Sequence, residues 1–157
     1  METALVLPVP EAAAVVDPWL GKGLSAHLTL TVPFLPSGRA DEVADFAAGM
    51  EPFDYALVRC ARFPTALYLV PEPDDRLHAL IDAVLRRWPE YPRYGGAHAD
   101  VVPHVTVAEN DFDSAEAAVA PRLPIAARAE ELLVLALVDP AARRWEPYAR
   151  FPLGAGR

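Results

Sequence analysis

Pro-His-Val-Thr-Val at residues 103–107 and Ala-His-Leu-Thr-Leu at residues 26–30 repeat one pattern, and this pattern decides the fold. Each copy places a histidine and a threonine two residues apart within a run of apolar, β-favouring residues. Because successive side chains of a strand point to opposite faces, His27 and Thr29 share one face, and Leu28, Leu30 and Val32 share the other. The same alternation pairs His104 with Thr106. We therefore expect two strands that together form the polar floor of a cavity, with an imidazole on each side.

The repetition carries more information than either copy alone. The chain has four histidines and five threonines among 157 residues, and two of the histidines are followed by a threonine two positions later. Random shuffling would produce such a doublet in about 0.6% of sequences. The alternative is a pair of half-buried strands whose histidines are satisfied by local hydrogen bonds, which is the more usual interpretation of any single histidine of this kind.

The two His-x-Thr-x motifs resemble those of the two-histidine (2H) phosphoesterase superfamily, in particular its bacterial 2'-5' RNA ligase and RNA 2',3'-cyclic phosphodiesterase branch. The resemblance covers most of the chain, with further matching segments at residues 4–8, 27–36, 63–73, 102–107 and 150–154. It implies a single α+β domain over residues 1–157. In that fold two pseudo-symmetric lobes of mostly antiparallel sheet, flanked by helices, enclose a central cleft with one motif strand on each side.

Two histidines on opposite walls suit the opening of a cyclic phosphate. One neutral imidazole can activate water while the other, protonated, supplies a proton to the leaving ribose oxygen. The resemblance implies that His27 and His104 are catalytic and that the hydroxyls of Thr29 and Thr106 bind the phosphate. The motifs do not say which histidine is the base, and we take His104 as the base and His27 as the acid. No cofactor is expected.

The predicted activity is therefore that of a metal-independent phosphoesterase in RNA processing, acting on the 2',3'-cyclic phosphate of an RNA end or a small nucleotide. Two alternatives stay open. The same fold could act as a 2'-5' RNA ligase or on another cyclic phosphate. It could also be a non-catalytic nucleotide-binding or interaction module, although binding alone would not require two titratable groups.

Composition limits the partners. A formal net charge of −8 argues against long duplex nucleic acid, which needs a basic face, but permits a small phosphorylated ligand or an RNA terminus. Cys60 is the only cysteine, so no intramolecular disulfide is possible. No apolar run reaches the roughly 20 residues of a membrane span. We expect a cytoplasmic monomer with no membrane contact.

Three further features bear on the site. Tyr68 stands in the apolar strand predicted at residues 66–70, either as a core residue or facing the cleft. Tyr94, with Tyr91, lies in the Pro/Tyr/Gly-rich loop at residues 89–100, which is either a base-stacking lid or a plain connection. His98 and Asp100 also lie in this loop, but no carboxylate or cysteine spacing supports a metal site there. Lys22, within Gly-Lys-Gly, lacks the spacing of a phosphate-binding P-loop and is either a solvated lysine or one that reaches an anion near the cleft.

Periodicity and turn signals predict the remaining elements. A first helix is expected at residues 11–16 and should end at Asp17-Pro18. A second should follow Ser37, which would cap it. Two more are expected from residue 75 to Trp88 and at residues 114–120. His78 lies beside the apolar stripe of the third of these helices as a surface residue. Strands are expected at residues 4–7, 53–63, 66–70 and 143–151, and a long bulged strand at residues 124–138.

Overall fold

The computed structural model describes residues 1–96 and 101–155. Within them the chain forms eight strands and four α-helices. Their bounds are β1 (Thr3–Pro8), α1 (Ala13–Leu20), β2 (His27–Thr31), α2 (Glu42–Ala48), β3 (Phe53–Phe63), β4 (Ala66–Glu72), α3 (Asp75–Arg87), β5 (Val105–Ala108), α4 (Phe112–Val119), β6 (Ile125–Ala129), β7 (Glu131–Asp139) and β8 (Arg144–Pro152). Short 3-10 turns occupy Pro10–Ala12, Ser37–Arg39, Arg93–Gly96 and Ala120–Arg122.

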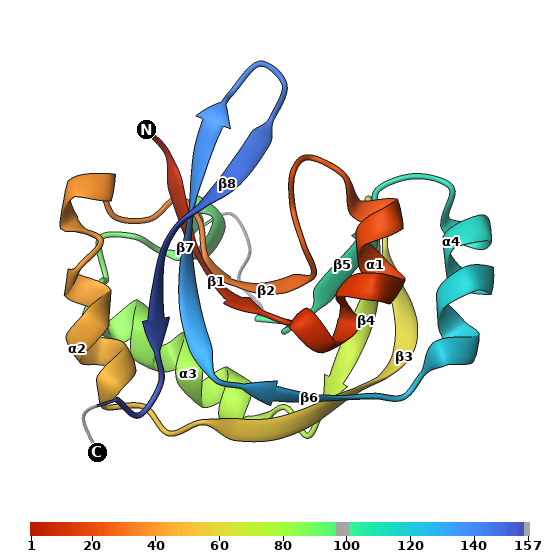
Figure 1. Cartoon of the computed structure of the whole chain (residues 1–157), viewed down its shortest axis with the longest axis horizontal. Coiled ribbons are helices and arrows are strands. Elements are labelled where there is room, and N and C mark those ends of the chain that lie inside the picture. The colour runs from red at the N-terminus through yellow and green to blue at the C-terminus, as the bar shows by residue number, and fades with distance from the viewer. Residues whose placement is uncertain (97–100, 156–157) are drawn as a thin grey trace.

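All eight strands belong to one curled antiparallel sheet with the order β6-β3-β4-β5-β2-β1-β7-β8 (Figure 1). The two motif strands, β2 and β5, are neighbours at its centre, where Leu28 pairs with Val105. Four strands therefore lie to each side of this central contact, β2-β1-β7-β8 and β5-β4-β3-β6, which are the two lobes that the resemblance implied. The fold is α+β, as predicted.

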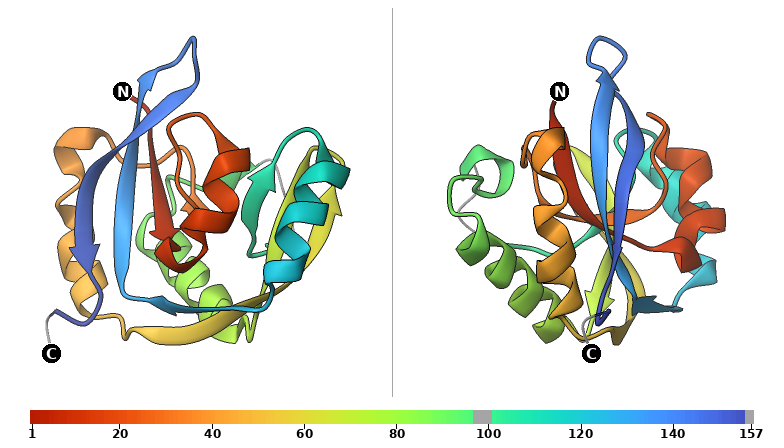
Figure 2. Two further views of the ribbon diagram at one scale, coloured as in Figure 1. Left: turned by 45° about the vertical axis from the view of Figure 1, so that its right-hand side comes forward. Right: turned by 60° about the vertical axis from the view of Figure 1, so that its left-hand side comes forward.

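The helices lie in two pairs, α1 with α4 on one side of the molecule and α2 with α3 on the other (Figures 1 and 2). Their apolar stripes meet the apolar side chains of the central strands in one core, in which Leu28, Leu30, Val105 and Val107 are fully buried. The stripe predicted for α3 is confirmed, with Leu77, Leu80, Ile81 and Val84 in the same core. No described helix is long and apolar enough to cross a membrane.

The predicted long strand at residues 124–138 is wrong, because the chain breaks at Glu130 into β6 and β7. β6 pairs with β3 at one edge of the sheet, whereas β7 pairs with β1 and β8 near the other edge. The curl of the sheet brings these distant positions together in space, so that consecutive strands belong to different lobes (Figure 1). A continuous apolar run gives no sign of such a division.

Three local predictions also fail. α1 continues through Pro18 to Leu20 instead of ending at Asp17-Pro18, since burial of Val16 and Leu20 outweighs the missing amide donor of the proline. Ser37 opens a separate 3-10 turn and does not cap α2, which begins at Glu42. Val32 follows the end of β2 and packs in a second cluster, with Ala4, Val6, Leu133 and Leu135, instead of joining Leu28 and Leu30.

An aromatic cluster around Trp88 holds α2 and α3 against the end of β2. The Trp88 ring is 1% exposed and lies 5.1 Å from Phe34 and 5.2 Å from Phe46. Tyr91 packs 6.1 Å from Phe34, and its carbonyl oxygen accepts a hydrogen bond from the buried Thr31 hydroxyl. Tyr91 therefore packs against the core and ties this loop to the end of β2.

Truncation of this cluster should destabilise the whole domain. We expect Trp88→Ala to lower the free energy of unfolding by about 3–5 kcal/mol, because it removes a large buried ring and leaves a cavity. Tyr148→Ala, at a 51% exposed position, should change it by no more than about 0.5 kcal/mol. Urea unfolding of both variants measures the difference, and equal effects would contradict this account of the core.

Candidate functional site

The strand register gathers the motif side chains on one face of the sheet. The central apolar row runs Cys60–Leu69–Val105–Leu28 across β3, β4, β5 and β2. A step of one residue along each strand, in one direction or the other, leads to two flanking rows. The side chains of both rows lie on the face of the sheet opposite to that of the apolar row. These rows are Ala61–Tyr68–Thr106–His27 and Arg59–Val70–His104–Thr29. We call the surface formed by these eight residues the motif face.

On the motif face each histidine stands opposite the threonine of the other strand. His27 faces Thr106, and His104 faces Thr29, so the two imidazoles occupy a diagonal. Side chains in direct cross-strand positions have Cβ atoms about 5 Å apart, and diagonal neighbours lie about 7–8 Å apart. All four side chains are half-buried, in contrast to the fully buried residues between them. The structure thus brings together the four residues that the sequence singled out.

Both imidazoles are held by the same local hydrogen bond. His27 Nδ1 lies 2.7 Å from the carbonyl oxygen of Ser25, and His104 Nδ1 lies 2.7 Å from that of Val102. A carbonyl oxygen only accepts, so Nδ1 carries the proton in each ring. In the neutral ring the second nitrogen, Nε2, is then the unprotonated one and can accept a proton. Half-buried strands with structural histidines were expected to show such local hydrogen bonds. The same bond would also fix the orientation of an imidazole that transfers a proton.

Burial lowers the pKa of both histidines below the ordinary 6.5, but their surroundings differ. At His27 the Ser25 hydrogen bond and the negative charge of Asp17 oppose the effect of burial on the pKa. At His104 the Val102 hydrogen bond opposes it, while the positive charges of Arg93 and His27 lower the pKa further. His27 therefore stands beside a carboxylate, whereas His104 stands beside the Arg93 guanidinium and is also affected by His27 when that ring is protonated. The influence of His27 on His104 also agrees with their diagonal placement.

Asp17 belongs to the support of His27. Its carboxylate accepts hydrogen bonds from the Ser25 hydroxyl at 2.7 Å and from the Ala26 amide at 2.8 Å, which fixes the loop that leads into β2. From the sequence, Asp17 was predicted only to end a helix. The loop that carries these contacts is close to the motif in sequence, but no spacing rule distinguishes it.

Arg93 is a further residue of the site, and the sequence did not point to it. It lies in the loop before the second motif, is 7% exposed, and donates a hydrogen bond from Nη2 to the Thr29 carbonyl oxygen at 3.1 Å. Its Nε has no hydrogen-bond partner among the described residues. Because a guanidinium is always charged, Arg93 brings a permanent positive charge close to His104. An arginine in a Pro/Tyr/Gly-rich loop gives no sequence signal of burial.

The two candidate tyrosines have different environments. Tyr68 stands beside Thr106 on the motif face, stacks on Phe63 at 4.2 Å, and meets the His104 ring edge-on at 5.5 Å. The Arg93 guanidinium lies over the Tyr94 ring, with Cζ 5.0 Å from the ring centroid. Tyr68 therefore faces the motif residues, not the core, and Tyr94 contacts them through Arg93.

The other candidate residues either lie away from the motif face or fall outside the described residues. Lys22 pairs with Glu109, in the segment that follows β5. His78 is partly exposed, as predicted, and pairs with Asp74 at 3.3 Å. His98 and Asp100 lie outside the described residues. No group of three or more His, Cys, Asp or Glu side chains that could hold a metal ion occurs within residues 1–96 and 101–155.

A curled antiparallel sheet with a His-x-Thr pair on each central strand defines a two-histidine phosphoesterase. The sequence profile of the 2'-5' RNA ligase superfamily matches residues 11–141, and the chain belongs to this superfamily. A search of curated proteins finds no match.

Solved structures share the fold at low sequence identity. One is described as a phosphoesterase, with 16% identity, a TM-score of 0.65, and coverage of 97% of this chain and 98% of that chain. TT0787 of Thermus thermophilus has 19% identity, a TM-score of 0.64 and full coverage of both chains. E. coli LigT complexed with NADP+ has 19% identity and a TM-score of 0.64, and covers 97% of this chain and 96% of that chain.

The two charges beside the histidines should act separately. Arg93→Gln removes a cation, so we expect the pKa of His104 to rise. Asp17→Asn removes an anion, so we expect the pKa of His27 to fall. NMR titration of the imidazole resonances, assigned with single His→Gln variants, measures both. A uniform shift of all histidines in either variant would indicate a general loss of structure instead.

Proposed function

We propose that this protein is a metal-independent phosphoesterase that opens the 2',3'-cyclic phosphate of an RNA end or a small nucleotide. The observation that carries the proposal is the diagonal arrangement of two similarly oriented imidazoles, each opposite a threonine, on one sheet face. A phosphate held over this diagonal would have a proton acceptor on one side and a proton donor on the other. In-line displacement at phosphorus needs this arrangement.

In the proposed reaction neutral His104 Nε2 takes a proton from water, and the resulting hydroxide attacks phosphorus. The bond from phosphorus to one ribose oxygen breaks, and His27 Nε2 gives its proton to that oxygen. The product is a terminal phosphate monoester with a free neighbouring hydroxyl. The hydroxyls of Thr29 and Thr106 donate hydrogen bonds to the non-bridging oxygens, where negative charge accumulates.

The charges around the site support this assignment of roles. A base must be neutral when the substrate arrives, and Arg93 favours the neutral form of His104 by lowering its pKa. An acid must be protonated, and Asp17 favours the protonated form of His27. A bound phosphate anion would raise the pKa of both imidazoles, since an opposite charge stabilises the protonated form.

The substrate class follows from the superfamily and from the nucleotides bound to its members. E. coli LigT has been crystallised with 3'-AMP, ATP and NADP+. A small nucleotide or an RNA terminus is therefore the proposed ligand here. With a ribose 5'-hydroxyl in place of water as the nucleophile, the same ring opening would join two RNA ends through a 2'-5' linkage, with His104 taking the proton of the 5'-hydroxyl and His27 protonating the departing 3'-oxygen.

Removal of either imidazole should abolish most of the activity. We expect His27→Ala and His104→Ala each to reduce kcat by about 10²–10⁴, because each supplies one proton transfer. The double variant should lose less than the product of the two losses, since both groups act in one step. Thr29→Ala and Thr106→Ala should cost about 0.5–3 kcal/mol of transition-state stabilisation. Turnover of 2',3'-cyclic nucleotides in EDTA measures all five variants.

Thr65→Ala, at an exposed hairpin turn, is the matched control and should leave kcat unchanged. Thermal melting of each variant separates chemistry from folding. Loss of wild-type turnover in EDTA, with recovery on addition of a divalent metal, would contradict the two-histidine mechanism. So would histidine variants that melt early but keep full activity per folded molecule.

The pH dependence provides a separate test of the roles. We expect kcat/KM to be bell-shaped, with the acid limb set by His104 and the alkaline limb by His27. Because burial lowers the pKa of both imidazoles in the free protein, the maximum should lie below pH 6.5. The kcat profile should lie at higher pH, since bound phosphate raises both pKa values. Asp17→Asn should move only the alkaline limb, towards lower pH, and movement of the acid limb instead would reverse the assignment.

A further inference from the structure

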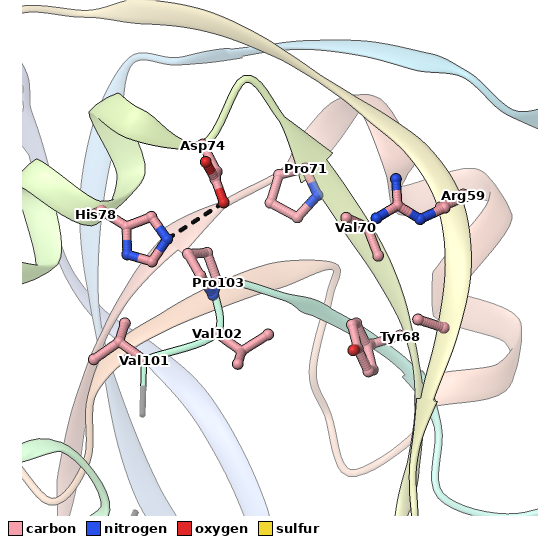
Figure 3. A pocket seen from close by; sticks show the side chains of 10 residues that line it. Arg59, Tyr68, Val70, Pro71, Asp74, His78, Val101, Val102 and Pro103 are labelled. Carbon is pink, nitrogen blue, oxygen red and sulfur yellow. Dashed lines mark ion pairs between the residues drawn. The ribbon is translucent and has the colours of Figure 1, made fainter. Parts of the chain in front are cut away.

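A cavity of about 260 Å³ lies over the β3 and β4 part of the motif face (Figure 3). Its floor continues the two rows that carry the motif residues, through Arg59, Tyr68 and Val70. Its other walls come from the start of α3, with Asp74 and His78, and from Val102 in the segment leading to His104. None of the functions proposed above uses this cavity.

The cavity touches His104 through two of its walls. Tyr68 lines it and meets the His104 ring edge-on, and the Val102 carbonyl oxygen accepts the hydrogen bond that orients the same ring. Neighbouring strands lie about 4.8 Å apart, so the centre of the cavity is roughly 10 Å along the sheet from a phosphate held between β5 and β2. That separation is within the reach of one nucleotide, from its ribose phosphate to its base.

The walls are chemically divided. Asp74, His78 and Arg59 contribute polar groups to the cavity, and Val70, Val102 and Pro103 contribute apolar surface (Figure 3). A nucleobase has the same division, with apolar faces and a polar edge. The volume lies just below the range of about 300–1,000 Å³ that holds drug-sized ligands, which suits one ring system and not a second nucleotide.

Charge distinguishes a base from a second phosphate. Arg59 is paired with Glu72 at 2.6 Å, and Asp74 places a carboxylate on the cavity wall. A phosphate in this position would lie close to these acidic groups. A neutral base with N–H donors would instead be attracted to the Asp74 carboxylate, which only accepts hydrogen bonds.

We propose that this cavity binds the nucleobase of the substrate and that Asp74 selects guanine. Guanine presents two adjacent donors, N1–H and the N2 amino group, which match the two oxygens of one carboxylate. Adenine and cytosine offer one amino group, and uracil offers a single ring N–H. His78 Nε2, 3.3 Å from Asp74 Oδ2, holds the carboxylate at the cavity wall. Arg59 adds donors for the acceptor atoms O6 and N7, the contact that arginine commonly makes with guanine.

The proposed selection of guanine rests on the proposed function only in that the phosphate is placed between the two histidines. Measurements of equilibrium binding test this selection without requiring catalysis. Calorimetric titration of the whole chain with 3'-GMP, 3'-AMP, 3'-CMP and 3'-UMP gives four dissociation constants. We expect 3'-GMP to bind at least tenfold more tightly than 3'-UMP. Asp74→Asn replaces one acceptor oxygen with a donor and should reduce this ratio to threefold or less.

Asp75→Asn is the matched control. It removes the same charge from the same helix start, but Asp75 does not line the cavity. The GMP-to-UMP ratio should stay unchanged in this variant. Using a ratio cancels the general effect of charge on anion binding. Asp74 makes no side-chain cap hydrogen bond, so α3 should form in both variants, as thermal melting will check.

Several results would overturn the proposal. They are equal affinities for the four nucleotides, no binding of any of them, a ratio that survives Asp74→Asn, or a ratio that falls equally in Asp75→Asn. Tighter binding of every nucleoside 3',5'-bisphosphate, whatever its base, would instead identify a phosphate subsite. A parallel assay of the turnover of 2',3'-cyclic GMP distinguishes failure of the base subsite from failure of the catalytic proposal. Discrimination without turnover supports the base subsite and ends the catalytic proposal, whereas turnover without discrimination does the reverse.

Discussion

The pairing of Leu28 with Val105 is the contact on which the rest of the structure depends. It joins the two four-stranded lobes, and it fixes which side chains of β2 and β5 face the core. Because side chains alternate along a strand, a slip of one residue would send the histidines and threonines of that strand into the apolar core. Burial of Leu28, Leu30, Val105 and Val107 makes such a slip costly. The same apolar residues that stabilise the core therefore set the geometry of the polar face.

The chemical difference between the two histidines comes from outside the repeated motif. Their local geometry is the same, down to the Nδ1 hydrogen bond with the carbonyl two residues earlier. What differs is the loop before each strand. The first loop is fixed by the Asp17 carboxylate, and the second carries the buried Arg93 guanidinium. A symmetric pair of imidazoles thus acquires opposite electrostatic surroundings, as the proposed acid and base of one step would require.

The sequence predicted what depends on local periodicity and missed what depends on curvature and loop paths. β3 has the predicted bounds, and both motif strands and the α3 stripe were recognisable from alternation and helical spacing. The division of residues 124–138 into β6 and β7 was not, because it arises from a sheet curled enough to bring its two sides together. Arg93 was missed for a related reason. Its burial depends on where the loop crosses β2, and no local pattern encodes that path.

The pseudo-symmetry of the lobes is broken on the motif face, and this asymmetry limits where a substrate can extend. Beyond β2, the corresponding surface of β1 and β7 is filled by Ala4, Val6, Leu133 and Leu135, which pack with Trp145 of β8. Beyond β5, the surface of β4 and β3 carries Tyr68 and Arg59 and opens into a cavity. A ligand whose phosphate lies at the centre of the sheet therefore meets apolar packing on one side and a polar cavity on the other. In the proposed function the central strands provide the groups for proton transfer, and the β3-β4 side offers space and polar groups that could distinguish one ligand from another.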